Sequence, residues 1–141
     1  MEVCCTEEFK QEIEKLRKNG SYANIESVLA DAYCDVTFEQ ANTGDLLGVM
    51  PGMNYLKKRL EGSGGYRFYL LAIVKGEKIY LGFVHPKAGR YGGDNVTPEK
   101  KKSILKELLA AIKSQQLYRI ERDNASTSRV RFLVHQPQNR T

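Results

Sequence analysis

Basic residues that could act on a phosphate are concentrated between Tyr55 and Tyr91. Lys57 and Arg59 stand two apart in a predicted strand, so both side chains project from one face of a sheet, and Lys58 projects from the other. Crowded cations lower one another's pKa, so a lysine here could lose its proton and act as a base. A set of such basic residues needs no metal to cleave RNA. The ribose 2′-hydroxyl supplies the nucleophile, and the protein only moves protons and stabilises charge on the phosphate.

Three further residue types accompany the basic strand. Arg67, in the next predicted strand, could hold a phosphate with its two-pronged guanidinium group. His85 ends the strand after that and could be an acid or a base, although a lone histidine at a strand end is more often structural. Tyr55, Tyr66 and Tyr91 could stack on bases or simply pack along strand edges. The set as a whole predicts a site for RNA.

Common enzyme signatures are absent: there is no Walker loop, no dinucleotide-binding glycine motif, no His-Glu-x-x-His and no Gly-x-Ser-x-Gly. His85 and His135 lie far apart without acids at metal-ligand spacing, so we expect no metal and no cofactor. The adjacent Cys4 and Cys5 point to opposite faces of a strand, and Cys34 stands alone. We therefore expect reduced cysteines, buried as small apolar residues in a cytoplasmic protein.

Charge is distributed unevenly along the 141 residues, whose formal net charge is +5. Residues 1–54 carry 4 Lys and Arg against 10 Asp and Glu, whereas residues 55–141 carry 18 against 7. The second part is therefore predicted to bind the anion, although lysines on helix faces also serve solubility. No apolar run approaches the roughly 18 residues that span a bilayer, and the N-terminus lacks the features of a signal peptide.

The elements before the basic strand are predicted from helix signals. A short strand over residues 2–5 is followed by Thr6, a good N-cap, and an apolar stripe at helical spacing that ends at Gly20. A second helix is predicted to start near Ser21, which completes a helical hairpin. Residues 35–54 are poorly periodic and predict a long connection.

The later elements are predicted as strands and one helix. Three strands near 55–61, 66–75 and 77–85 are joined by turns that suit antiparallel hairpins, and residues 68–74 are apolar on both faces. Thr97-Pro98-Glu99 is a strong helix start. The tail predicts a hairpin over 117–121 and 130–134, and a disordered polar end from Gln136. We predict one α+β domain over residues 1–141: a twisted antiparallel sheet, with the helical hairpin and the C-terminal helix packed on one face, and an extension from about 116.

Several short segments, in this order, resemble the RelE/ParE superfamily of bacterial type II toxins. They are a basic Tyr-x-Lys-x-Arg-Leu strand at 55–60, a Gly-Tyr-Arg entry at 65–67, an Ile-Tyr-Leu strand at 79–81 and a Thr-Pro-Glu-Lys-Lys helix start at 97–101. The resemblance covers roughly residues 1–115. It implies the activity of the RelE branch, which cleaves mRNA in the ribosomal A site. It also implies a cognate antitoxin that wraps the toxin.

The resemblance also implies roles for individual residues. The residues that match its catalytic positions are Lys57, Arg59, Arg67, Lys87 and Tyr91, and Arg90 matches the basic end of the following strand. Together with Arg90, the residues expected to contact RNA are Lys58, Tyr66 and His85, which are chosen by their types and their places in the strands. The family's terminal catalytic tyrosine has two possible counterparts here, Tyr91 and Tyr118.

Two other functions remain open at the level of the sequence. A ParE-type protein would share the resemblance but poison DNA gyrase without catalysis, and the cationic strand favours RNA cleavage over that function. A catalytically inactive relative would bind RNA or a protein partner, which fits the insecure match of the terminal tyrosine.

Overall fold

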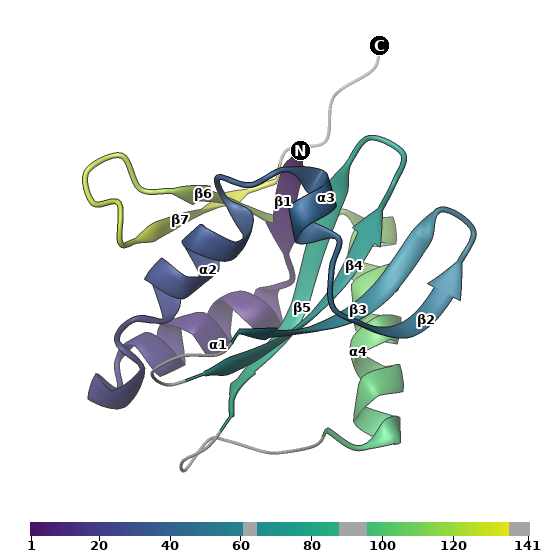
Figure 1. Ribbon diagram of the computed structural model, residues 1–141, viewed down its shortest axis with the longest axis horizontal. Coiled ribbons are helices and arrows are strands. Elements are labelled where there is room, and N and C mark those ends of the chain that lie inside the picture. Colours follow the sequence, from purple (N-terminus) through teal and green to yellow (C-terminus); the bar gives the residue numbers. More distant parts are fainter. Residues whose placement is uncertain (61–64, 88–95, 136–141) are drawn as a thin grey trace.

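The computed structural model describes residues 1–60, 65–87 and 96–135. Within these ranges a seven-stranded sheet has the order β2-β3-β4-β5-β1-β6-β7, with helices on both of its faces (Figure 1). The strands are β1 (Glu2–Cys5), β2 (Asp45–Met50), β3 (Met53–Leu60), β4 (Tyr66–Ile73), β5 (Lys78–Pro86), β6 (Tyr118–Arg122) and β7 (Val130–Val134). The helices are α1 (Glu7–Arg17), α2 (Ile25–Tyr33), α3 (Phe38–Ala41) and α4 (Pro98–Ser114), with a 3₁₀ turn at Gly20–Tyr22. The α+β class is confirmed.

The opening strand lies inside the sheet. β1 runs parallel to β5, with Glu2 opposite Lys78, and antiparallel to β6, with Cys4 opposite Arg119. The sheet is therefore mixed, and the prediction of a wholly antiparallel sheet is wrong at this one pair of strands. The parallel pairing is feasible because a long stretch of helices and strands separates β1 from β5 in the chain.

Both strong helix starts are confirmed in atomic detail. The Thr6 hydroxyl accepts a hydrogen bond from the Phe9 amide at 3.1 Å, and the Thr97 hydroxyl accepts one from the Lys100 amide at 3.1 Å. Each bond satisfies an amide that has no partner within its own helix. Proline occupies the first turn of α4, as expected.

Two predicted boundaries differ from the structure. The second helix begins at Ile25 rather than near Ser21, because the 3₁₀ turn intervenes. The supposed connection over 35–54 contains α3, which starts with a capping box between Thr37 and Gln40, and the edge strand β2. A four-residue helix is too short to show periodicity, and a register shift between Leu46 and Gly48 interrupts the alternation of β2.

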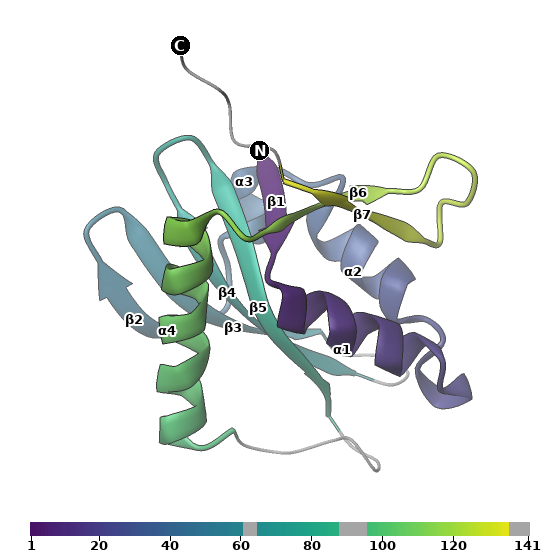
Figure 2. The same ribbon diagram turned by 180° about the vertical axis from the view of Figure 1, so that it is seen from behind.

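The sheet carries a separate apolar cluster on each face. α1 and α2 cover the face that includes Phe68, whereas α4 covers part of the face that includes Leu71. α4 lies behind the sheet in Figure 1 and in front of it in Figure 2. The prediction that all the helices pack on one face is therefore wrong, because β4 is apolar on both faces and needs cover on both. α4 approaches β5 closely at Gly82, where an added Cβ would lie 2.7 Å from Leu108 Cγ.

The C-terminal hairpin of β6 and β7 extends the sheet, as predicted, and is tied to the helices. Glu26 of α2 is almost fully buried and accepts a hydrogen bond from the Val130 amide at 3.1 Å. The Arg122 guanidinium pairs with Asp31 at 3.0 Å and Asp35 at 2.5 Å. The predicted disorder from Gln136 concerns residues outside the described ranges. None of the helices in those ranges is long and apolar enough to cross a membrane.

Candidate functional site

Strand register gathers four of the predicted residues on the α4 face of the sheet. Arg59 of β3 lies opposite Arg67 of β4, which in turn lies opposite His85 of β5. Lys57 lies two residues from Arg59 and therefore projects from the same face. We call Lys57, Arg59, Arg67 and His85 the cationic cluster. Three adjacent strands thus present their basic side chains to one area.

The first turns of α4 mark the border between the covered and the cationic parts of this face. The Tyr55 hydroxyl donates to the Lys101 carbonyl oxygen at 2.7 Å, which fixes the helix against β3. The Lys100 ammonium lies over the Phe83 ring, with Nζ 4.7 Å from its centroid. The helix dipole is positive at this end, so α4 adds to the positive potential around the cluster.

His85 and Tyr69 place two buried polar atoms without partners beside the cations. The His85 side chain is 6 % exposed, and its Nδ1 donates to the Pro86 carbonyl oxygen at 2.9 Å. In a neutral ring this bond leaves the lone pair on Nε2. Within the described ranges neither His85 Nε2 nor Tyr69 Oη has a hydrogen-bond partner, and the two rings stack with centroids 5.9 Å apart.

The surroundings lower the pKa of both His85 and Lys57. Burial is the main cause for His85, with further lowering by the charges of Lys57 and Arg67, against the opposing effect of the bond to Pro86. Burial also comes first for Lys57, followed by the charges of Arg59, Lys101 and Arg67. His85 is therefore a neutral base near pH 7, and the Lys57 ammonium gives up its proton more readily than an ordinary lysine. A phosphate would relieve the repulsion among these cations.

The two arginines of the cluster are held differently. Arg59 is about half exposed and pairs with Asp45 of β2 at 3.0 Å. Arg67 is 8 % exposed, and one of its guanidinium nitrogens donates to the Tyr66 carbonyl oxygen at 3.4 Å. Arg67 is thus fixed in place by the sheet, whereas Arg59 can turn toward a ligand that replaces Asp45.

Lys58 is not part of the cluster, although it was expected to contact RNA. Its side chain lies on the opposite face, where Nζ donates to the Gln40 carbonyl oxygen at 3.0 Å and to Thr43 Oγ1 at 2.9 Å. The ammonium also lies over the Tyr33 ring, 5.5 Å from the centroid. These contacts fix α3 and the start of β2 on the sheet, which is a structural role.

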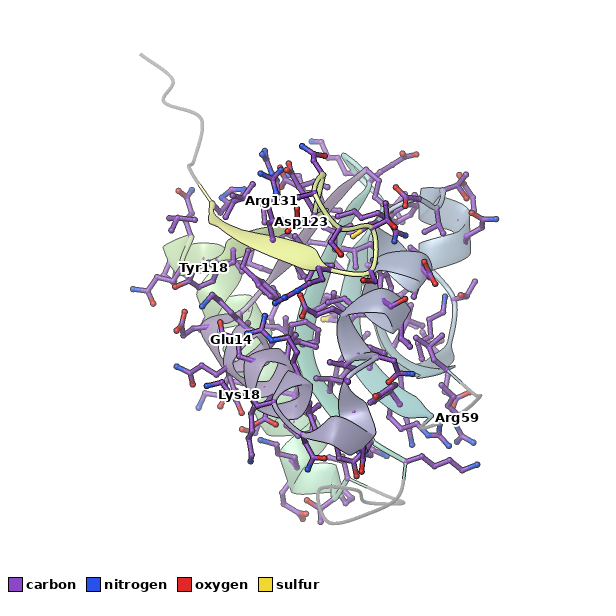
Figure 3. The ribbon with its side chains drawn as sticks, turned by 90° about the vertical axis from the view of Figure 1, so that its left-hand side faces the viewer. Glu14, Lys18, Arg59, Tyr118, Asp123 and Arg131 are labelled. Atoms are coloured by element: carbon purple, nitrogen blue, oxygen red, sulfur yellow. The ribbon has the colours of Figure 1, made fainter. Side chains whose placement is uncertain are left out.

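Two of the tyrosines considered also lie on the α1 and α2 face. Tyr66 is buried there, and its hydroxyl donates to Asn24 Oδ1 at 2.6 Å. Tyr118 packs under the Lys10 ammonium, 5.2 Å from the ring centroid. Figure 3 shows Tyr118 and Arg59 on opposite sides of the molecule. Tyr118 is therefore excluded as the terminal tyrosine of a site built on the cationic cluster.

Three further predicted residues follow β5 in the chain. Lys87 is exposed, and its amide donates to the Gly65 carbonyl oxygen at 2.7 Å, beside the start of β4. Arg90 and Tyr91 lie outside the described residues. The structure thus places Lys87 at the edge of the cluster's strands. The roles of Arg90 and Tyr91 stay predictions.

Tyr69 is a member of the site that the sequence did not single out. It lies opposite Lys57 on β4, and Lys57 Nζ is 6.0 Å from the centroid of its ring. Burial raises the pKa of its hydroxyl, against the lowering effect of Arg67 and Arg59. The signal was available in principle, because residues 67 and 69 share a face, but an apolar run conceals it.

Comparison with models of known protein families, with curated proteins and with solved structures finds no match for this chain. The functional argument therefore depends on the geometry of the cationic cluster.

Proposed function

We propose that the protein is a metal-independent endoribonuclease of the RelE-like kind, a toxin that inhibits translation by cutting mRNA. The observation that carries the proposal is the meeting of a neutral His85 base, an acidified Lys57 and two arginines on adjacent strands. RNA cleavage through the 2′-hydroxyl needs this combination of a base, an acid and charge stabilisation, and it needs no cofactor.

The chemistry assigned to each residue follows from its surroundings. His85 Nε2 takes the proton of the 2′-hydroxyl, and the resulting oxyanion forms a bond to phosphorus while the bond to the 5′-oxygen breaks. Lys57 gives its proton to that departing oxygen. Arg67, held by the sheet, stabilises the negative charge on the phosphorane. The products would be a 2′,3′-cyclic phosphate and a 5′-hydroxyl.

A protein with this activity needs a partner that silences it. The proposed partner is an antitoxin with an acidic segment, because acidic side chains complement the cluster in the way that a phosphate does. Asp45 already shows this kind of pairing within the chain, since its carboxylate binds Arg59 at 3.0 Å. The target is proposed to be mRNA on the ribosome.

RNA cleavage by the purified protein tests the proposal, with naked RNA and translating ribosomes as parallel substrates. We expect cuts that persist in the presence of a chelator, with the ends named above, and no cut where the 2′-hydroxyl is replaced by hydrogen. Arg67→Ala is expected to lower the cleavage rate by about 10²–10³-fold. Arg131→Ala, which removes an exposed arginine of the C-terminal hairpin, is the matched control and should cleave normally.

Induction in cells separates the proposal from its alternatives. Growth arrest with new RNA ends inside translated mRNA, lost in Arg67→Ala, supports a ribonuclease. Arrest with intact transcripts and broken DNA would indicate a gyrase poison instead. RNA binding without cleavage under all conditions would indicate an inactive relative.

A further inference from the structure

Three potential metal ligands meet at the end of β5 remote from His85. Glu2 and Cys4 project from the same face of β1, opposite Lys78 and Tyr80 of β5, and His135 directly follows β7. Cys4 Sγ lies 3.7 Å from Glu2 Oε1, and His135 Nε2 lies 3.4 Å from the same oxygen. All three ligand atoms lie within 4.8 Å of one another.

These separations are those of a tetrahedral zinc site. Bond lengths of about 2.0–2.3 Å to oxygen, nitrogen and sulfur place neighbouring ligand atoms about 3.3–3.8 Å apart. Both distances from Glu2 Oε1 fall in that range. The third pair, Cys4 Sγ and His135 Nε2, lies within 4.8 Å, and the His135 ring that would close this gap is partly exposed.

The ligand types and their exposure also favour zinc. A thiolate, an imidazole and a carboxylate form the mixed set that Zn²⁺ accepts, whereas Ca²⁺ and Mg²⁺ require oxygen ligands. Cys4 is fully buried, while the Glu2 and His135 side chains are 34 % and 20 % exposed. The thiol thus forms the floor of the site, and the open side leaves a fourth position for water.

We propose that Glu2, Cys4 and His135 bind one Zn²⁺ ion, which joins the central strand β1 to the end of the C-terminal hairpin. Binding releases the thiol proton of Cys4 and any proton on His135 Nε2, because the metal takes the thiolate and the neutral imidazole. Burial first, and then the charge and hydrogen bond of Glu2, raise the pKa of the Cys4 thiol to about 12 in the absence of metal, against the smaller lowering effects of Arg119 and Lys78, so the metal itself must displace this proton.

The sequence predicted no metal site, and this proposal departs from that prediction. His135 and Glu2 are 133 residues apart, so no spacing motif connects them. Only the insertion of β1 beside β6, with β7 on the far side of β6, brings them together. The simpler explanation for the contact is an ion pair between His135 and Glu2 without metal, and the experiment below distinguishes the two.

The test uses the full-length protein without an affinity tag, stripped with a chelator and titrated with Zn²⁺ against a competing indicator. We expect one equivalent of Zn²⁺ per chain and a rise in Tm. Replacing Zn²⁺ by Co²⁺ should produce the thiolate-to-cobalt charge-transfer band of a cysteine ligand. Cys4→Ser and His135→Gln should each weaken binding by more than about 100-fold.

Cys34→Ser is the matched control, because it removes the half-buried thiol of the helical side and should leave zinc affinity and the cobalt band unchanged. Substoichiometric zinc in the wild type would overturn the proposal, as would full affinity in His135→Gln. The His135 side chain is partly exposed and follows the last strand, so His135→Gln disturbs the fold less than Cys4→Ser does and decides the matter even if Cys4→Ser does not fold. None of these measurements depends on RNA cleavage.

Discussion

Lys57 and Lys58 are neighbours on β3, yet their side chains lie on opposite faces of the sheet and have different surroundings. Lys58 meets oxygen acceptors from Gln40 and Thr43, so its charge is compensated within the fold. Lys57 is 5 % exposed and faces Arg59, Arg67 and His85 instead. Burying a charge among like charges costs stability, and such arrangements cluster at functional sites.

The same contrast holds one strand further on. Phe68 packs among the rings of Phe9, Tyr33 and Tyr66 on the helical side, with centroid distances of 5.9–6.5 Å. Tyr69 is equally buried but keeps a hydroxyl without a partner in the described part of the chain. Tyr33 on the helical side also has a buried hydroxyl without a partner in the described residues, so the two faces differ chiefly in charge. The helical side of β4 packs aromatic rings together, and the other side sets the Tyr69 hydroxyl beside the buried cations Lys57 and Arg67.

The largest expected effect comes from substitutions of Phe68 and Tyr69. Phe68→Ala should lower the free energy of unfolding by about 3–5 kcal/mol, because it leaves a cavity in the packed cluster. Tyr69→Phe should raise it by about 1 kcal/mol, because it removes a buried hydroxyl for which the described residues supply no hydrogen bond. Denaturant unfolding measures both. A loss of stability in Tyr69→Phe would contradict the contrast between the two faces.

The lysine pair sharpens the contrast in terms of activity. Lys57→Met should lower RNA cleavage by about 10²–10³-fold, equivalent to about 2.7–4 kcal/mol, while leaving stability unchanged or higher. Lys58→Met should cleave normally and lose about 1 kcal/mol of stability with its two hydrogen bonds. The two variants serve as controls for each other. Equal effects on cleavage would contradict the assignment of Lys57 to the site and of Lys58 to a structural role.

The smallest expected effect is a pH dependence that comes from His85. Its folded pKa lies below 6.5, so the unfolded chain binds the proton more readily just below that pH. The stability contribution is therefore complete above pH 6.5 and is lost as the pH falls, at no more than about 1.4 kcal/mol per pH unit. Urea unfolding between about pH 5 and pH 8 should show this slope in the wild type and a smaller one in His85→Gln. The reverse slope would mean that His85 is charged in the fold.

Local signals in the sequence were sufficient for much of the fold. The Thr6 and Thr97 caps, the β3 to β5 hairpins and the C-terminal hairpin depend on neighbouring residues, and all are confirmed. The alternation at Lys57, Lys58 and Arg59 also predicted correctly which cations share a face. These features are set by backbone geometry over a few residues, which a sequence displays directly.

Features that depend on distant pairing escaped the sequence. The alternating pattern of a strand does not indicate on which face a later helix packs, so the predicted position of α4 was wrong. Similarly, nothing in residues 2–5 indicates a parallel partner at 78–81. Tyr69 was missed in part for the same reason: the apolar run conceals that it shares a face with Arg67, and only strand pairing places it opposite Lys57 and beside His85.

The central place of β1 has a consequence for how the chain folds. β1 pairs with β5 some 76 residues later in the chain and with β6 some 115 residues later, as the pairs Glu2 with Lys78 and Cys4 with Arg119 show. Such non-local pairing slows folding, because loop-closure entropy is lost before the contacts form. Until β6 emerges, β1 has an unpaired edge that can pair with other chains. Completion of the sheet is therefore a late event in the life of a nascent chain.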